Sequence, residues 1–248
     1  MPLSQNIYNN KPNNIATTRI QFDIDQINKD NDILDKELIY FKFCTDENIN
    51  TKYHQMLVGP SDTPYSGGYY IFEGQFPDIY PFQPMKMKSL TQGGDVRKHP
   101  NLYRCGKCCF SFLGTWSGPP WTPCQNARTV ASSMRSVLTK MPLENEPGFE
   151  NVCEKKNEHE KYAYLIGYFN LKYAICNILE NIDNPPNVYF KDKILKLFRD
   201  NYSNYILELL KYDKDNGKKI NSPVYQFNLL IDTNDLRKRF IDLKEKYI

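Results

Sequence analysis

The sequence lacks any long apolar run, the feature that marks an integral membrane protein. No stretch approaches the roughly eighteen uncharged apolar residues of a membrane-spanning helix. The first fourteen residues, MPLSQNIYNNKPNN, also contain no apolar segment of the kind found in a secretory signal. We therefore expect a soluble protein of the cytoplasm, the nucleus or both.

A surplus of charge of one sign is also missing. The 248 residues include 32 Lys and Arg and 29 Asp and Glu, which gives a net charge of +3. The two signs are interspersed along the chain, so no basic footprint for phosphate groups is visible. The sequence therefore predicts neither nucleic acid nor a membrane surface as a partner.

The cysteines do not form a disulfide pattern. There are seven, an odd number, and they are spread unevenly over a long chain, unlike the framework of a secreted disulfide-rich domain. We expect reduced thiols. Hydrophobic residues make up 40% and charged residues 25% of the chain, which is the composition of a globular protein.

The spacing of apolar residues divides the chain into parts with different periods. Residues 1–13 are polar and predict a flexible N-terminus. Helical spacing predicts a helix over 14–28, and the pattern then changes to short alternating or aromatic-rich runs, which indicate a four-stranded antiparallel meander. The expected strands are 38–43, 53–59, 68–76 and 85–90.

A long loop and then a helix are expected after these strands. Residues 91–123 have no clear period, and such long loops inside a compact domain are usually functional. A helix is expected over about 124–141. Three apolar stripes at helical spacing predict an all-helical extension over 151–248. We expect this extension to pack against residues 14–150 rather than to form a separate bundle or to bind a partner.

Three of the seven cysteines lie within residues 105–109, and the sequence alone allows several roles for them. Cys105 and Cys108 form a C-x-x-C pair that could bind zinc together with His99 and Cys124. Structural zinc sites normally combine two closely spaced ligand pairs, however, and a second pair is missing. A disulfide is disfavoured in a reducing compartment. The cysteines could also fill space in the core, or one of them could be a nucleophile.

The sequence around this cluster resembles the ubiquitin-conjugating enzymes. Five features occur in the family's order: the turn GPSDTPYSGG, the loop FPDIYPFQP, the triplet HPN, a cysteine eight residues after its Asn, and PPWTP before a helix. The segments GTWSGPPW and NEPGFE and the helical C-terminal region are similar to the branch known as ubiquitin-conjugating enzyme Z. The resemblance implies an α+β ubiquitin-conjugating fold, with a core domain at 14–150 and the helical extension at 151–248.

The resemblance implies that Cys109 accepts ubiquitin, or a ubiquitin-like modifier, from an activating enzyme and passes it to lysines of protein substrates. The modifier is held as a thioester, so the cysteine must offer an accessible thiolate. Asn101 is the implied hydrogen-bond donor to the oxyanion that forms during attack. An Asn at this position could also merely cap a turn.

Further positions have implied supporting roles. Three are expected to support the active site structurally: His99, Pro100 and Trp121. Glu146, within the acidic segment ENEPGF, is expected to receive the proton of the attacking lysine. Glu146 could instead belong to a solvated charged loop. Cys108 is expected to point away from Cys109 and to be buried.

The resemblance also implies partners. A RING-type ligase would contact Phe82 in one loop and Pro123 with Cys124 in another. Met85 and Cys124 depart from the family pattern, which leaves the choice of ligase open. Ser111 stands where many members have Asp, so more of the acidic role in catalysis is left to residues 144–146. No cofactor is expected, because ATP and magnesium are used by the activating enzyme. Two different functions stay open: an inactive variant that only presents ubiquitin, and a zinc-stabilised interaction module.

Overall fold

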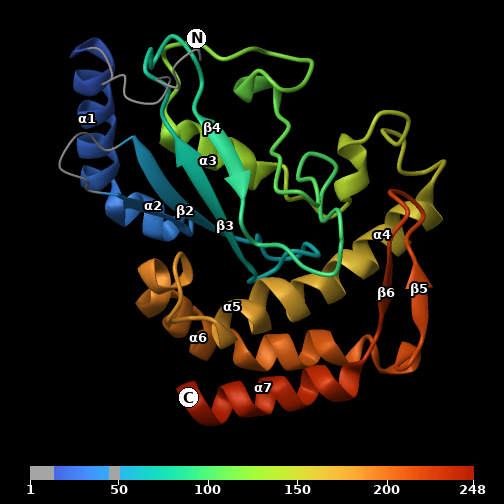
Figure 1. The fold of residues 1–248 in the computed structure, drawn as a ribbon. Coiled ribbons are helices and arrows are strands. Elements are labelled where there is room, and N and C mark those ends of the chain that lie inside the picture. The colour runs from blue at the N-terminus through green and yellow to red at the C-terminus, as the bar shows by residue number, and fades with distance from the viewer. Residues whose placement is uncertain (1–13, 45–50) are drawn as a thin grey trace, which may run out of the picture.

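The computed structural model describes residues 14–44 and 51–248 (Figure 1). Its centre is an antiparallel sheet in which each strand pairs with the next, in the order β1-β2-β3-β4. The strands are β1 (Ile39–Phe43), β2 (Lys52–Val58), β3 (Tyr69–Gln75) and β4 (Lys86–Ser89). The predicted four-stranded meander is confirmed, with each strand end within one residue of its expected place. The expected flexible segment 1–13 lies outside the described residues.

Helices precede and follow the sheet along the chain. Before it come α1 (Asn14–Lys29) and α2 (Asn31–Lys36), and after it come the 3-10 turn η1 (Ser111–Leu113) and α3 (Ala127–Ser136). Asn126 caps α3, because its side chain accepts the N–H of Thr129 while the Thr129 side chain accepts the N–H of Asn126. On the face of β2, Gln55 Nε2 contacts Met134 Sδ of α3 at 3.6 Å.

Helix α3 is shorter than the predicted helix over 124–141. It ends at Ser136, with Val137 as its C-cap, so the predicted continuation of the helix to residue 141 is wrong. Pro142 begins the next 3-10 turn, η2 (Pro142–Asn145), and the residue before a proline is disfavoured in helical conformation. The carbonyl group of Val137 is thereby left without a helical partner, and the candidate site uses it.

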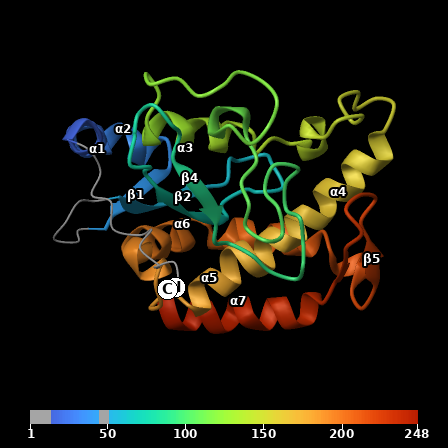
Figure 2. The same ribbon diagram turned by 45° about the horizontal axis from the view of Figure 1, so that its top comes forward.

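The C-terminal extension contains three long helical segments, as its stripes predicted. The first runs through α4 (Lys156–Phe169), the π-helical segment η3 (Asn170–Cys176) and α5 (Asn177–Glu180). The second is α6 (Lys191–Leu210), preceded by the 3-10 turn η4 (Asn187–Phe190), and the third is α7 (Thr233–Tyr247). Figures 1 and 2 show α7 as the outermost layer, with α5 and α6 between it and the sheet.

This extension packs against the sheet. Asn170, the first residue of η3, lies against the core domain. Its Oδ1 accepts a hydrogen bond from the Tyr70 hydroxyl at 2.7 Å, and its Nδ2 donates one to the Ser66 carbonyl at 2.9 Å. A Cβ at Gly68 would lie 1.8 Å from Asn170 Oδ1, so this approach requires glycine. The apolar core is continuous across the expected boundary at residue 150, and the division into two domains stays a prediction.

The extension is not entirely helical. A hairpin of β5 (Lys219–Asn221) and β6 (Asn228–Leu230) follows the short 3-10 turn η5 (Asp213–Asp215), and it contradicts the all-helical prediction for this region. Strands of three residues are too short to show an alternating pattern. In Figure 1 the hairpin stands beside α4, at the side of the molecule opposite α1. Among the residues described, no helix has the length and apolarity to cross a membrane.

Candidate active site

The triplet His99–Pro100–Asn101 forms a buried turn beside the end of α3. His99 is completely buried, its Nδ1 accepts the N–H of Asn101 at 3.0 Å, and its Nε2 lies 3.0 Å from the Val137 carbonyl oxygen. Nε2 must therefore carry the proton of a neutral ring. Burial lowers the pKa of His99 to about 3, so the ring stays neutral at physiological pH. This geometry agrees with a scaffold rather than a base.

Asn101 is joined directly to Cys109. Its Nδ2 donates to the Cys109 carbonyl oxygen at 2.7 Å, and its own carbonyl accepts the N–H of Cys109 at 2.9 Å. An amide nitrogen carries two hydrogens, and no described residue takes the second one. The side chain is thus fixed beside the cysteine, eight residues away in sequence, with one donor to spare.

Cys109 is covered, contrary to the expectation of an accessible thiol. Its side chain is only 3% exposed, and its Sγ–H donates to the carbonyl oxygen of Thr115 at 2.6 Å. The Thr115 hydroxyl fixes this cover, since Oγ1 accepts the N–H of Phe110 at 2.9 Å and donates to the Cys108 carbonyl at 3.2 Å. Residues 114–120 are all exposed, so the carbonyl that binds the sulfur belongs to a surface loop. Sequence reasoning missed Thr115, although the motif GTWSGPPW contains it.

Cys108 is buried, as predicted, and packs within the apolar core. Burial raises the pKa of its thiol to about 12, which makes it a poor nucleophile. Lys98 is also completely buried near Cys108, and its Nζ has no hydrogen-bond partner among the described residues. Burial lowers the pKa of Lys98 to about 8. Nothing in the sequence pattern identified Lys98 as a buried residue.

The zinc hypothesis does not fit this geometry. Both ring nitrogens of His99 are engaged with the backbone, Cys108 is buried, and Cys105 and Cys124 are exposed. Within residues 14–44 and 51–248, no three His, Cys, Asp or Glu side chains are grouped closely enough to hold a metal ion. The four residues are therefore not arranged as a zinc site.

Arg97 connects Glu146 to the buried turn of His99, Pro100 and Asn101. Its Oε2 is 3.8 Å from Arg97 Nη2, and Arg97 Nε donates to the Pro100 carbonyl at 3.2 Å. The same Oε2 accepts the hydroxyl of Tyr225 at 2.5 Å. Glu146 is thus a fixed, partly exposed carboxylate and not a freely solvated one. Sequence reasoning missed both Arg97 and Tyr225.

The two expected ligase-binding loops lie on one surface. Phe82 is 62% exposed, and Pro123 and Cys124 are exposed as well. Trp121 joins the loops, because its Nε1 donates to the Pro81 carbonyl at 2.7 Å. Trp121 was expected to support the active site, and its described polar and ring contacts are with Pro81 and Tyr80, next to the surface on which a ligase is expected to bind.

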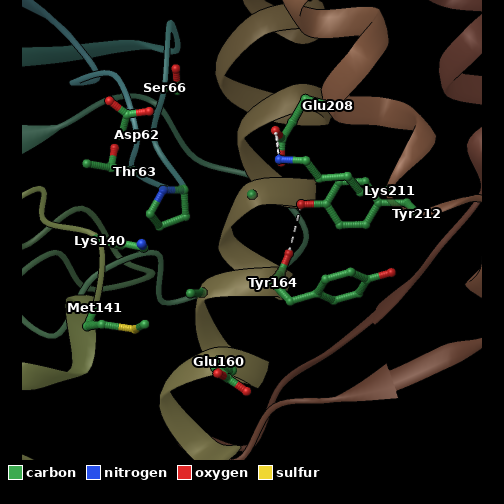
Figure 3. Close-up of a pocket in the computed structure, with 13 residues that line it drawn as sticks. Asp62, Thr63, Ser66, Lys140, Met141, Glu160, Tyr164, Glu208, Lys211 and Tyr212 are labelled. Atoms are coloured by element: carbon green, nitrogen blue, oxygen red, sulfur yellow. Dashed lines mark hydrogen bonds and ion pairs between the residues drawn. The ribbon is translucent and has the colours of Figure 1, made fainter. Parts of the chain in front are cut away.

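A pocket of about 670 Å³ lies elsewhere, between the core domain and the extension (Figure 3). Its lining combines Asp62 and Lys140 of the core with Tyr164 of α4 and Lys211 and Tyr212 just after α6. The Tyr212 hydroxyl donates to the Tyr164 carbonyl at 3.1 Å, which fixes one wall. None of the expected catalytic residues lines this pocket, so it is separate from the candidate active site.

Comparison with known proteins agrees with the motifs and the topology. The family model described as ubiquitin-conjugating enzyme matches residues 19–169. The chain belongs to the ubiquitin-conjugating enzyme family. It is 38% identical over 156 residues to ubiquitin-conjugating enzyme E2 Z of Xenopus tropicalis, a match covering 62% of this chain and 49% of that protein. With the E2 Z of Homo sapiens the identity is 41% over 131 residues, covering 52% and 37%.

These ubiquitin-conjugating relatives carry the name of the branch that the motifs indicated, and the chain spans about half of their length or less. Among solved structures, human ubiquitin-conjugating enzyme E2 G1 matches with 28% identity and a TM-score of 0.41. That match covers 50% of this chain and 93% of the other.

Proposed function

We propose that this protein is a ubiquitin-conjugating enzyme that carries ubiquitin, or a ubiquitin-like modifier, as a thioester on Cys109 and passes it to substrate lysines. The main support is the pair of hydrogen bonds that joins Asn101 to the backbone of Cys109, because they fix an amide donor next to this cysteine. An inactive variant that only presents ubiquitin would not need this arrangement.

Charging begins when the Cys109 sulfur is uncovered. The thiol loses its proton, and the thiolate attacks the thioester carbonyl carbon of ubiquitin on the activating enzyme. A new S–C bond forms at Cys109 while the cysteine of the activating enzyme leaves as a thiolate. The contact between Sγ and the Thr115 carbonyl must break first. The exposed loop 114–120 can move away without opening the core.

Transfer of the modifier to a lysine uses two fixed side chains, Asn101 and Glu146. A lysine amine attacks the thioester carbonyl carbon, and negative charge develops on the carbonyl oxygen. The spare hydrogen of Asn101 Nδ2 stabilises that oxyanion. Glu146 receives the proton of the attacking amine as the C–N bond forms. The C–S bond then breaks, and Cys109 leaves as a thiolate.

The partners follow from this reaction. An activating enzyme supplies the thioester with ATP and magnesium, and the conjugating step itself needs no cofactor, because a thioester already has the required reactivity. A RING-type ligase would bind the surface formed by Phe82, Pro123 and Cys124. The expected locations are the cytoplasm, the nucleus or both.

A charging assay tests the proposal. Purified protein is incubated with ubiquitin, Mg-ATP and a panel of activating enzymes, and the products are separated on non-reducing gels with and without a thiol reductant. We expect an adduct of one ubiquitin that the reductant removes. Cys109→Ser should abolish it or make it resistant to reductant, whereas the matched variant Cys108→Ser should charge normally. Absence of an adduct with every activating enzyme would contradict the proposal.

A further inference from the structure

The loop that joins β5 and β6 reaches Glu146 from the C-terminal extension. Tyr225 lies in this loop, 79 residues after Glu146, and its hydroxyl donates to Glu146 Oε2 at 2.5 Å. The hydrogen bond from Tyr225 and the ion pair with Arg97 both involve Oε2 of Glu146, and no described residue donates to Oε1. One oxygen is therefore fixed by the protein, and the other has no donor among the described residues.

Arg97 fills the space between the loop and the buried turn. Its guanidinium carbon lies 4.1 Å from the ring centroid of Tyr225 and 3.9 Å from that of Tyr103. The Tyr162 hydroxyl of α4 donates to the Arg97 carbonyl at 2.6 Å. A single cation thus links the Glu146 carboxylate, the Tyr225 ring and the Pro100 carbonyl.

The conformation of Tyr225 is held by its surroundings. Tyr225 and Gln226 have φ values of +60° and +49°, a region that residues with a side chain rarely adopt. Arg104 Nη2 donates to the Tyr225 carbonyl at 2.7 Å, and the Tyr162 ring packs against the Tyr225 ring at 5.9 Å. Residues kept in sparsely populated backbone conformations occur preferentially at functional sites. Burial and the bond to Glu146 raise the pKa of Tyr225, so its hydroxyl keeps its proton and stays a donor.

We propose that Tyr225 is a positioning residue for lysine transfer, and that the C-terminal extension takes part in catalysis through it. The inference rests on the function proposed above, in which Glu146 receives the proton of the attacking amine. Tyr225 holds Oε2 so that Oε1 faces the lysine. The proton moves from the amine to Oε1 as the C–N bond forms and the C–S bond to Cys109 breaks.

The test follows the discharge of protein that already carries ubiquitin, after the activating enzyme has been stopped. Tyr225→Phe keeps the ring on Arg97 and removes only the hydroxyl. We expect it to slow discharge to free lysine about tenfold with charging unchanged, because a misoriented acceptor loses part of the roughly hundredfold or larger contribution of a positioned one. Tyr103→Phe is the matched control, because its ring also contacts Arg97 but its hydroxyl is not bonded to Glu146, and we expect no change.

Two further measurements separate positioning from a general structural effect. Hydroxylamine is unprotonated at neutral pH and needs no proton acceptor to become a nucleophile, so Tyr225→Phe should leave discharge to hydroxylamine unchanged. Glu146→Gln should slow discharge to lysine, and adding Tyr225→Phe to it should slow discharge no further.

Three results would overturn the inference: unchanged or faster discharge to lysine in Tyr225→Phe, equal slowing with lysine and hydroxylamine, or additive effects of the two substitutions. Each of these leaves the charging function intact. If the unmodified protein accepts no ubiquitin, the proposed function fails first, and the role of Tyr225 fails with it.

Discussion

Cys109 lies between two stretches of chain that are built differently. The stretch before it is buried and fixed at several atoms: His99 binds the backbone of Val137 and Asn101, and Asn101 binds the backbone of Cys109 twice. A stretch after it, residues 114–120, is exposed and accepts a hydrogen bond from the Cys109 sulfur at the Thr115 carbonyl. A fixed donor and a movable cover suit the two needs of the reaction, which are preorganisation for transfer and access for charging.

Removal of the donor on the fixed side should have the largest effect. In Asn101→Ala we expect discharge of the preformed thioester to lysine to fall about a hundredfold or more, because one oxyanion donor is lost. Single-turnover discharge, followed on non-reducing gels, measures this rate independently of charging. An unchanged rate would mean that Asn101 only caps the turn.

The fixed side also contains a destabilising residue. Lys98 is buried and its ammonium group has no partner within residues 14–44 and 51–248, so Lys98→Met should stabilise the protein by about 1–3 kcal/mol in urea unfolding at neutral pH. The pKa of Lys98 is about 8 in the folded state and 10.5 when unperturbed, so the gain should shrink as the pH rises from 8 to 10.5. Lys107→Met, at an exposed position, is the control and should change stability by less than about 0.5 kcal/mol. Equal effects at the two positions would contradict this description of Lys98.

His99 should make the fixed side sensitive to acid. The unfolded chain takes up a proton at His99 near pH 6.5, whereas the folded pKa is about 3, so the stabilisation is complete above pH 6.5 and is lost as the pH falls. At pH 5.5 this one group should remove about 1.4 kcal/mol relative to pH 7.5. Urea unfolding at both pH values measures the loss. His99→Asn, which can still accept the Asn101 N–H but does not titrate, should lose that much less stability between the two values; equal losses would refute the assignment.

The exposed side should give the smallest effect. Thr115→Ala removes the three hydroxyl contacts that fix the cover, and we expect alkylation of Cys109 by iodoacetamide to become a few times faster, equivalent to about 1 kcal/mol. Peptide mass spectrometry follows each thiol. The exposed Cys105 and Cys153 serve as internal controls whose rates should not change. An unchanged Cys109 rate would show that Thr115 does not control access.

The sequence predicts some parts of this site and misses others. The strands and the HPN turn depend on local patterns and spacing, and they lie where the sequence placed them. The bond from Tyr225 to Glu146 joins positions 79 residues apart, and the cover of Cys109 depends on the direction of the Thr115 carbonyl six residues away. No periodic sequence pattern records either contact. The hairpin was missed because its strands have three residues each. The contact of Trp121 with Pro81 was not predicted, because spacing gives the loop but not the direction of its side chain.

The most direct measurement is a thiol footprint of the charged protein. The protein is charged with ubiquitin, and all free thiols are blocked with N-ethylmaleimide in mildly acidic urea. The thioester is then cleaved, and the newly released thiol is labelled with a second reagent and located by peptide mass spectrometry. We predict that Cys109 alone, among the seven cysteines, carries the second label. The second label on Cys105, Cys108 or Cys124 instead would contradict the role assigned to Cys109.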